Sequence, residues 1–116
     1  MKKASLGLLL AALLCGSAHA FSTDFLDYSG MANFTSADWN LAKENAIKAL
    51  ETAKDNSKLS WSNPQTKASG YAIPSNTIHV PGATICRDLF VHNQAYKVID
   101  EASYHFCKIN GQWRVA

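Results

Sequence analysis

Residues 84–109 read TICRDLFVHNQAYKVIDEASYHFCKI, and this stretch decides the fold of the chain. Two parts of it, 84–91 and 98–109, are rich in β-branched and aromatic residues, which is typical of strands. Each part carries one cysteine, Cys86 in the first and Cys107 in the second. The stretch therefore predicts two long strands, and the cysteines bear on how these strands pair.

The N-terminal residues 1–20 are typical of a secretory signal. Two lysines precede the apolar stretch 6–14, and Ala18-His19-Ala20 fits the A-x-A pattern of a cleavage site. The apolar stretch is shorter than the roughly 20 residues that cross a bilayer, so we predict an export signal rather than a membrane span. No second long apolar run follows, so we predict no transmembrane segment in the mature chain. The third cysteine, Cys15, lies inside the signal, and Leu13-Leu14 before it fit a lipidation site poorly.

The charge of the chain lies largely in this signal. The sequence has 11 Lys and Arg residues and 9 Asp and Glu residues, which gives a net charge of +2. The two signal lysines account for that excess, so the exported chain is close to neutral. Its basic residues are scattered along the sequence, which argues against nucleic-acid binding.

The cysteine pair that remains after export has two interpretations. Exported proteins fold in an oxidising compartment, which favours a Cys86–Cys107 disulfide. Alternatively, both thiols bind zinc or copper together with His105 and either His79 or His92. No CxxC or HxxxH spacing supports the metal site, so we predict the disulfide, no metal and no cofactor.

The disulfide also predicts which residues face each other in the hairpin. A tight turn at Asn93-Gln94, the most polar candidate, leaves the two cysteines about 20 Å apart along the strand. A disulfide needs Cα atoms within about 7 Å, so we predict a turn at Tyr96-Lys97 or a wider loop over residues 93–100. In that register Asp88 faces His105 and Leu89 faces Tyr104.

A helix precedes the strands. Thr35 fits an N-cap, Asp38 completes a capping box, and apolar residues follow at helical spacing until the helix ends near residues 55–57. Beside the two long strands, short ones are expected at 59–62, 68–73, 77–80 and 112–115, with breaks at Asn63-Pro64, Pro74-Ser75-Asn76, Pro81-Gly82 and Asn110-Gly111.

The predicted fold is α+β, with one amphipathic helix on an antiparallel sheet of about five strands. The chain divides into the signal 1–20, an arm 21–34 and a single domain 35–116.

Several short motifs of the domain occur in a recognisable order. They are Trp61-Ser62-Asn63-Pro64, Ser69-Gly70, Pro74, Cys86-Arg87, Cys107-Lys108 and Asn110-Gly111-Gln112-Trp113. Together they resemble the C-terminal domain of the rickettsial 17 kDa surface-antigen family, small exported proteins of Gram-negative bacteria. The resemblance covers about residues 36–116 and implies a fold and an envelope location. Full-length members also carry a lipidated cysteine and a glycine-zipper segment, which this sequence lacks.

The predicted register brings an acid and an imidazole together, Asp88 and His105, a pair that can orient a base. Ser103 lies on the same strand and face, so a Ser-His-Asp set is conceivable. The sequence has no nucleophile-turn motif, and strand positions two apart seldom give the geometry of attack. We therefore predict no catalytic residue. The candidate ligand-facing residues are Arg87, Asp88, His105, Lys108 and Trp113.

These features predict a non-catalytic exported protein, located in the periplasm, at the outer membrane or outside the cell. Its role is binding or structural, and its partner is an envelope protein or a cell-wall component. The alternative is a secreted inhibitor or immunity-type protein that blocks a periplasmic or host enzyme through an exposed loop. A rigid loop in a small disulfide-bonded domain loses little entropy on binding, which suits that role.

Overall fold

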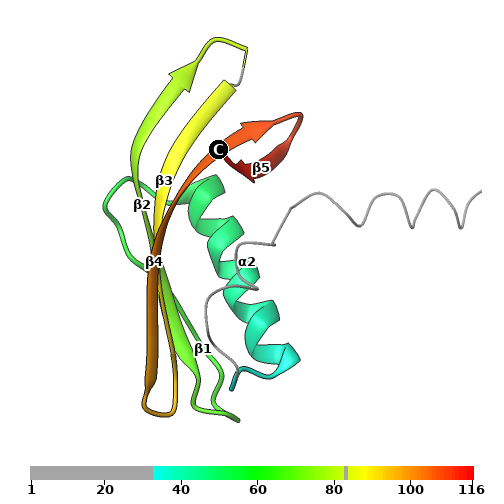
Figure 1. The fold of residues 1–116 in the computed structure, drawn as a ribbon, viewed down its shortest axis with the longest axis vertical. Helices are drawn as coiled ribbons and strands as arrows, with labels where there is room; N and C mark the ends of the chain where they lie inside the picture. The colour runs from blue at the N-terminus through cyan, green and yellow to red at the C-terminus, as the bar shows by residue number, and fades with distance from the viewer. Residues whose placement is uncertain (1–32, 83) are drawn as a thin grey trace, which may run out of the picture.

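The structure is a computed structural model that describes residues 33–82 and 84–116. Within this part of the chain, five strands form one antiparallel sheet in sequence order, and the helix α2 packs against one face of it (Figure 1). The α+β prediction is confirmed. The predicted signal and all but the last two residues of the predicted arm lie outside the described residues. The elements are α2 (Ser36–Thr52), β1 (Leu59–Ser62), β2 (Ser69–Val80), β3 (Thr84–Ala95), β4 (Val98–Ile109) and β5 (Gln112–Val115).

The helix begins as predicted. The backbone N–H of Thr35 donates to Asp38 Oδ2 (3.0 Å), and the backbone N–H of Asp38 donates to Thr35 Oγ1 (3.1 Å), which completes the capping box. Phe34 packs edge-on against Trp39 with ring centroids 4.9 Å apart, the contact of a hydrophobic staple. The helix ends at Thr52, earlier than the predicted residues 55–57, because Ala53 already has extended backbone angles.

Asp38 also forms hydrogen bonds with the loop between β1 and β2. Its Oδ1 accepts hydrogen bonds from Asn63 Nδ2 (2.8 Å) and Thr66 Oγ1 (2.7 Å). Burial alone would raise the pKa of this carboxyl, but the hydrogen bonds from Thr35, Thr66 and Asn63 outweigh burial and hold the pKa below its usual range. The loop and the first turn of the helix therefore share one ionised, fully buried carboxylate.

The predicted hairpin register is confirmed. Cys86 pairs with Cys107, Asp88 with His105 and Leu89 with Tyr104, and the two cysteines form a disulfide with Cα atoms 4.0 Å apart. The turn lies at Tyr96-Lys97, and Tyr96 takes the left-handed conformation that the turn requires, with φ 57°. The cysteines thus predicted the turn better than local turn propensity did.

The predicted division of residues 68–80 into two strands is wrong. Residues 69–80 lie in one strand, β2, with a bulge between Ser75 and Ile78. β1 pairs with β2 only as far as Ala72, so Pro74 lies beyond the end of β1, where its missing N–H costs no hydrogen bond to that strand. The Pro74 carbonyl accepts a hydrogen bond from the backbone N–H of Asn56 at 2.7 Å. Within the bulge, Asn76 takes the left-handed conformation with φ 50°. The strand therefore continues through Pro74-Ser75-Asn76, a sequence that is typical of a turn.

The core lies between α2 and the sheet in two adjoining clusters. Leu50, Leu89, Phe106 and Trp113 dominate the first cluster, and Trp61 lies in the second with Phe34 and three alanines. Gly70 leaves room for Trp61, because a Cβ at position 70 would lie 2.6 Å from the indole Nε1 and 2.4 Å from a neighbouring backbone oxygen. In the described residues, no helix is both long and apolar enough to cross a membrane.

Candidate functional site

The structure separates the five candidate ligand-facing residues into two groups. Side chains alternate between the faces of a strand, so Arg87, Lys108 and Trp113 point toward α2, whereas Asp88 and His105 lie on the opposite side. We call the side of the sheet turned away from α2 the outer face. Its residues on β3 and β4 include Cys86, Asp88, Phe90, Ser103, His105 and Cys107.

The prediction that Arg87 faces a ligand is wrong, because the residue is only 5% exposed and its side chain contacts the C-terminal end of α2. Nη1 donates to the carbonyls of Ala49 (3.1 Å) and Leu50 (2.7 Å), and Nη2 donates to that of Ala53 (2.6 Å). The last carbonyls of a helix lack the full set of partners within it, although the Ala49 carbonyl also accepts from the backbone N–H of Ala53 at 3.1 Å. The negative end of the helix dipole favours a cation at this position. Nη2 also forms an ion pair with Asp55 Oδ1 at 2.9 Å.

Trp113 and Lys108 also contact the helix. Trp113 is 2% exposed, and its Nε1 donates to Glu51 Oε1 at 3.2 Å. Lys108 Nζ forms an ion pair with the same carboxylate at 2.9 Å. The hydrogen bond from Lys108, helped by the one from Trp113, lowers the pKa of Glu51. These contacts connect β4 and β5 to α2. The burial of Trp113 corrects its prediction as ligand-facing, whereas the side chain of Lys108 is 30% exposed and its prediction stays untested.

We expect Asp55→Asn to weaken the dependence of stability on pH between about pH 4 and pH 2. Hydrogen bonds from Thr77, and then from Arg87, lower the pKa of Asp55 from its ordinary value of 3.8 to about 2. A pKa that folding lowers gives stability that is present above the ordinary value and lost as the pH falls through the folded value. Urea unfolding at steps of pH measures this slope. Asp100→Asn, next to the β3–β4 turn, is the control, and an equal slope in Asp55→Asn and wild type would contradict the expectation.

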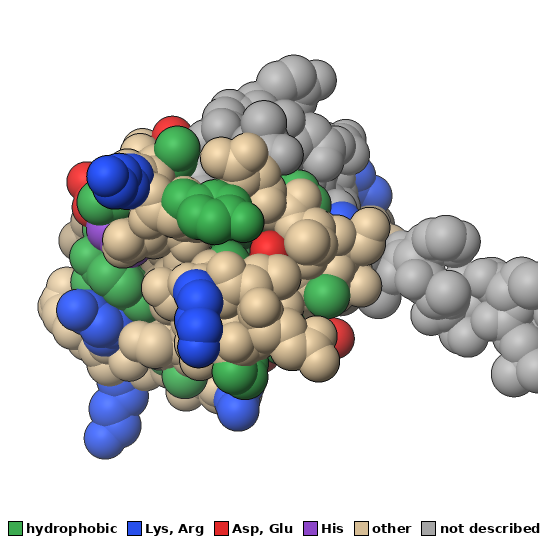
Figure 2. All heavy atoms as spheres, turned by 90° about the horizontal axis from the view of Figure 1, so that it is seen from below, with side chains coloured by type: hydrophobic (Ala, Val, Ile, Leu, Met, Phe, Trp, Pro, Cys, Tyr) green, Lys and Arg blue, Asp and Glu red, His purple; other side chains and the backbone are tan. Residues whose placement is uncertain are grey.

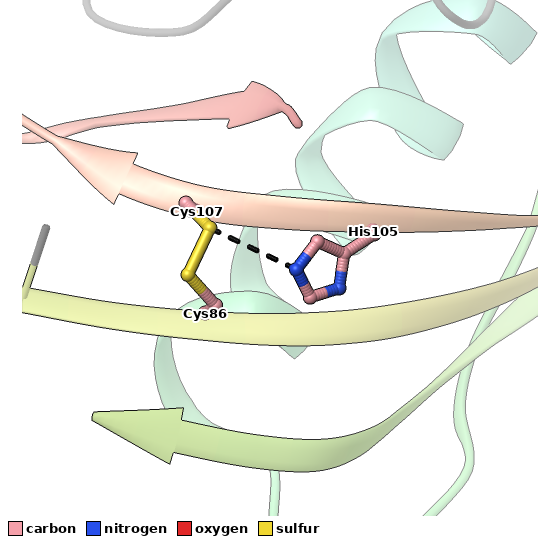
Figure 3. Close-up of side chains that lie close together, drawn as sticks. All are labelled: Cys86, His105 and Cys107. Atoms are coloured by element: carbon pink, nitrogen blue, oxygen red, sulfur yellow. Dashed lines mark hydrogen bonds between the residues drawn. A yellow bond between two sulfur atoms is a disulfide. The ribbon is translucent and has the colours of Figure 1, made fainter. Parts of the chain in front are cut away.

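Asp88 and His105 form the centre of the outer face. Asp88 Oδ1 lies 2.6 Å from His105 Nδ1, and Asn76 Nδ2 donates to Asp88 Oδ2 at 2.8 Å. The hydrogen bond from Asn76, followed by that from His105, lowers the pKa of Asp88. The other ring nitrogen, Nε2, lies 3.9 Å from Cys107 Sγ (Figure 3). A Ser-His-Asp mechanism requires Nε2 at a serine hydroxyl, but here Nε2 faces a disulfide sulfur.

A hollow of about 430 Å³ opens on the outer face beside this pair. The strand bulge brings Ser75 and Asn76 to it, and the neighbouring strands add Asp88, Ser103 and His105. Phe90 provides an aromatic wall, so hydroxyl, amide, carboxylate and imidazole groups lie next to a ring. We call this hollow the outer pocket. Sequence reasoning missed Ser75 and Asn76. The sequence Pro74-Ser75-Asn76 suggested a turn, and only the bulge places Asn76 beside Asp88.

Aromatic side chains continue the outer face beyond the pocket. Tyr71 stacks on His92 with ring centroids 4.6 Å apart and lies 6.3 Å from Phe90. His92 Nδ1 pairs with Glu101 Oε2 at 2.7 Å, which repeats the imidazole–carboxylate arrangement of His105 and Asp88. The outer face therefore combines an open polar pocket with a row of rings.

The turn between β3 and β4 is a second exposed feature. Tyr96 is 77% exposed, and Val98 and Ile99 beside it are exposed as well. Figure 2 views the molecule from the end that carries this turn and shows hydrophobic side chains interspersed with separate Lys and Arg side chains. On this face the basic side chains form no continuous stripe.

Comparisons with models of protein families, with curated proteins and with solved structures find no match to this chain.

Proposed function

We propose that the chain is a non-catalytic, exported protein of the bacterial envelope that binds a polar component of the cell wall in the outer pocket. The observation that carries this proposal is the outer pocket itself, on the face of the sheet that α2 leaves uncovered. The Cys86–Cys107 disulfide supports an oxidising compartment. The predicted export signal and the resemblance to the surface-antigen family support the same location.

The chemistry of the pocket suits a hydrogen-bonding ligand. Ser75, Asn76 and Ser103 offer hydroxyl and amide groups, and Phe90 offers a surface for an apolar or sugar-ring face. Asp88 and His105 are held to each other at 2.6 Å, so they present fixed polar atoms rather than a free base. Glycan strands and short peptides of the cell wall are ligands of this kind.

Co-sedimentation of the purified, disulfide-bonded protein with isolated cell-wall sacculi tests this proposal. Ser103→Arg places a long cationic side chain in the pocket, and we expect it to reduce the bound fraction at least about fivefold, which corresponds to roughly 1 kcal/mol. Ser36→Arg, an exposed serine at the start of α2, is the matched control and should bind as wild type does. Wild-type binding no greater than that of an unrelated protein, or equal binding of both variants, would refute the proposal.

The exposed β3–β4 turn favours a second function, the inhibition of a periplasmic or host enzyme. A projecting turn with a large aromatic tip can enter the cleft of an enzyme, and Tyr96 has the exposure that this requires. Tyr96→Asn removes the ring and keeps a residue that tolerates positive φ. If Tyr96→Asn abolishes capture by the envelope fraction while Ser103→Arg does not, the inhibitor role replaces the cell-wall role.

A further inference from the structure

Cys86, Cys107 and His105 form a cluster of potential metal ligands on the outer face. Their Sγ and ring nitrogen atoms all lie within 4.8 Å of one another (Figure 3). We propose that reduction of the disulfide converts this cluster into a binding site for one zinc ion, with two thiolates and the His105 imidazole as ligands. This proposal does not rest on the cell-wall function, although the zinc site shares His105 with the outer pocket.

The spacing of the three groups suits a tetrahedral ion. His105 Nε2 lies 3.9 Å from Cys107 Sγ, and the sulfur and nitrogen ligands of zinc lie about 3.5 Å from each other when both are bound. Reduction frees each sulfur to turn about its own Cα–Cβ bond while the paired strands keep Cys86 opposite Cys107. The small change required is a rotation of side chains and not a movement of the backbone.

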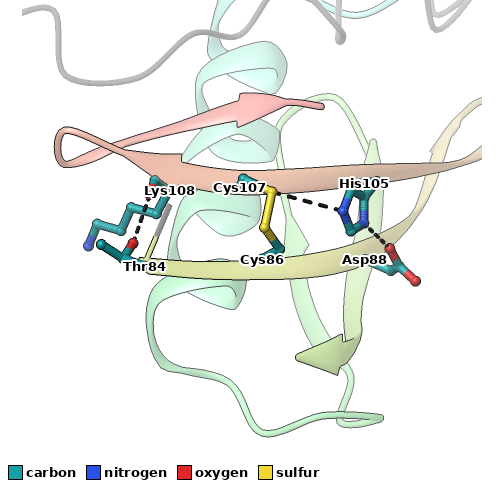
Figure 4. The surroundings of a disulfide bond; sticks show 6 residues. All are labelled: Thr84, Cys86, Asp88, His105, Cys107 and Lys108. Atoms are coloured by element: carbon teal, nitrogen blue, oxygen red, sulfur yellow. Dashed lines mark hydrogen bonds and ion pairs between the residues drawn. A yellow bond between two sulfur atoms is a disulfide. The ribbon is translucent and has the colours of Figure 1, made fainter. Parts of the chain in front are cut away.

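A second observation, independent of the cysteines, points to a ligand at His105 Nε2. Zinc-binding histidines commonly direct their other ring nitrogen to a carboxylate, which fixes the ring and its tautomer. His105 Nδ1 lies 2.6 Å from Asp88 Oδ1 (Figure 4). Asn76 Nδ2 donates to the other oxygen of that carboxylate. The ring is therefore oriented with Nε2 toward the sulfurs. The side chain of His105 is 46% exposed, which leaves the fourth position of the ion to water or to a ligand in the outer pocket.

The chemistry balances with a dithiol as the reductant. The dithiol gives two electrons and two protons to the Cys86–Cys107 bond, which becomes two thiols, and the dithiol becomes a disulfide. Zinc then displaces both thiol protons and forms two Zn–S bonds and one Zn–N bond. Thiolate and imidazole ligands favour zinc over magnesium or calcium, which prefer oxygen. The disulfide thus keeps the site closed in an oxidising compartment.

Zinc titration of the reduced protein against a chromophoric chelator tests the proposal, with Co²⁺ absorption as a report on thiolate coordination. We expect one zinc ion per reduced chain and no binding to the oxidised chain. Asp88→Asn should weaken binding about 10–100-fold, and His105→Ala should weaken it at least as much. His92→Ala is the matched control, because His92 pairs with Glu101 on the same face and has no cysteine beside it in the sheet register.

Three results would overturn the zinc site. The first is reduced wild type that binds no more zinc than the oxidised protein does. The second is His105→Ala with the affinity of wild type. The third concerns folding: if reduction unfolds the chain, zinc must restore the native circular dichroism, since a metal that binds the folded state favours folding. A reduced chain that stays unfolded in excess zinc contradicts the proposal.

Discussion

Replacing Arg87 with methionine is expected to lower the free energy of unfolding by about 3–5 kcal/mol. The substitution keeps much of the apolar stem but removes the guanidinium donors to the carbonyls of Ala49, Leu50 and Ala53. Two of those hydrogen bonds are buried. The Ala49 carbonyl keeps the hydrogen bond from the Ala53 N–H, but a buried acceptor that is left without a partner costs about 1–3 kcal/mol. The ion pair with Asp55 is lost as well. Urea unfolding followed by far-ultraviolet circular dichroism measures the change.

Two further variants separate the role of the Arg87 side chain from that of its charge. Arg87→Lys keeps the charge but places one nitrogen where the guanidinium has three, so we expect it to recover less than half of the loss. Arg114→Met alters an exposed arginine of β5 and should change stability by less than about 0.5 kcal/mol. Equal stabilities of Arg87→Met and Arg114→Met would show that Arg87 does not hold the end of α2.

Removing the disulfide is expected to have the next largest effect. The double variant Cys86→Ala with Cys107→Ala should lose about 3 kcal/mol, because the bond joins residues 21 positions apart and its loss restores the entropy of that loop in the unfolded chain. The wild-type protein in oxidised form is the reference, and urea unfolding again gives the difference. The alanine pair leaves no thiol to react. A loss below about 1 kcal/mol would mean that the β3–β4 pairing holds the sheet without the bond.

The hairpin register could be predicted because a disulfide allows only a short distance between its two cysteines. Turn propensity favoured Asn93-Gln94, but a disulfide between Cys86 and Cys107 is compatible only with a later turn, and the structure has that turn at Tyr96-Lys97. The start of α2 was equally accessible, because the capping box depends on two residues close in sequence. The continuity of β2 through Pro74 could not be predicted in the same way. Pro74 is tolerated because it lies beyond the end of β1, and local sequence does not show where a neighbouring strand ends.

The candidate site was predicted in part. Strand alternation in the confirmed register already separates Arg87 from Asp88 and Lys108 from His105, so this error lay in grouping neighbours that face opposite ways. The partners of Arg87 were beyond reach, since they are carbonyls at the end of a helix more than 30 positions earlier in the chain. Most residues that carry the family resemblance, Trp61, Asn63, Gly70, Arg87 and Trp113 among them, make packing or hydrogen-bonding contacts inside the fold.

Nuclear magnetic resonance tests most directly whether the outer face is the binding surface. Soluble glycan and peptide fragments of the cell wall are added to the isotope-labelled, oxidised protein, and the shifts of each backbone amide are followed. The account predicts saturable shifts that gather at Asn76, Asp88, Ser103 and His105 and leave the exposed side of α2 unchanged. Shifts confined to the β3–β4 turn or to α2 would contradict this account, as would the absence of shifts at millimolar concentrations of the fragments.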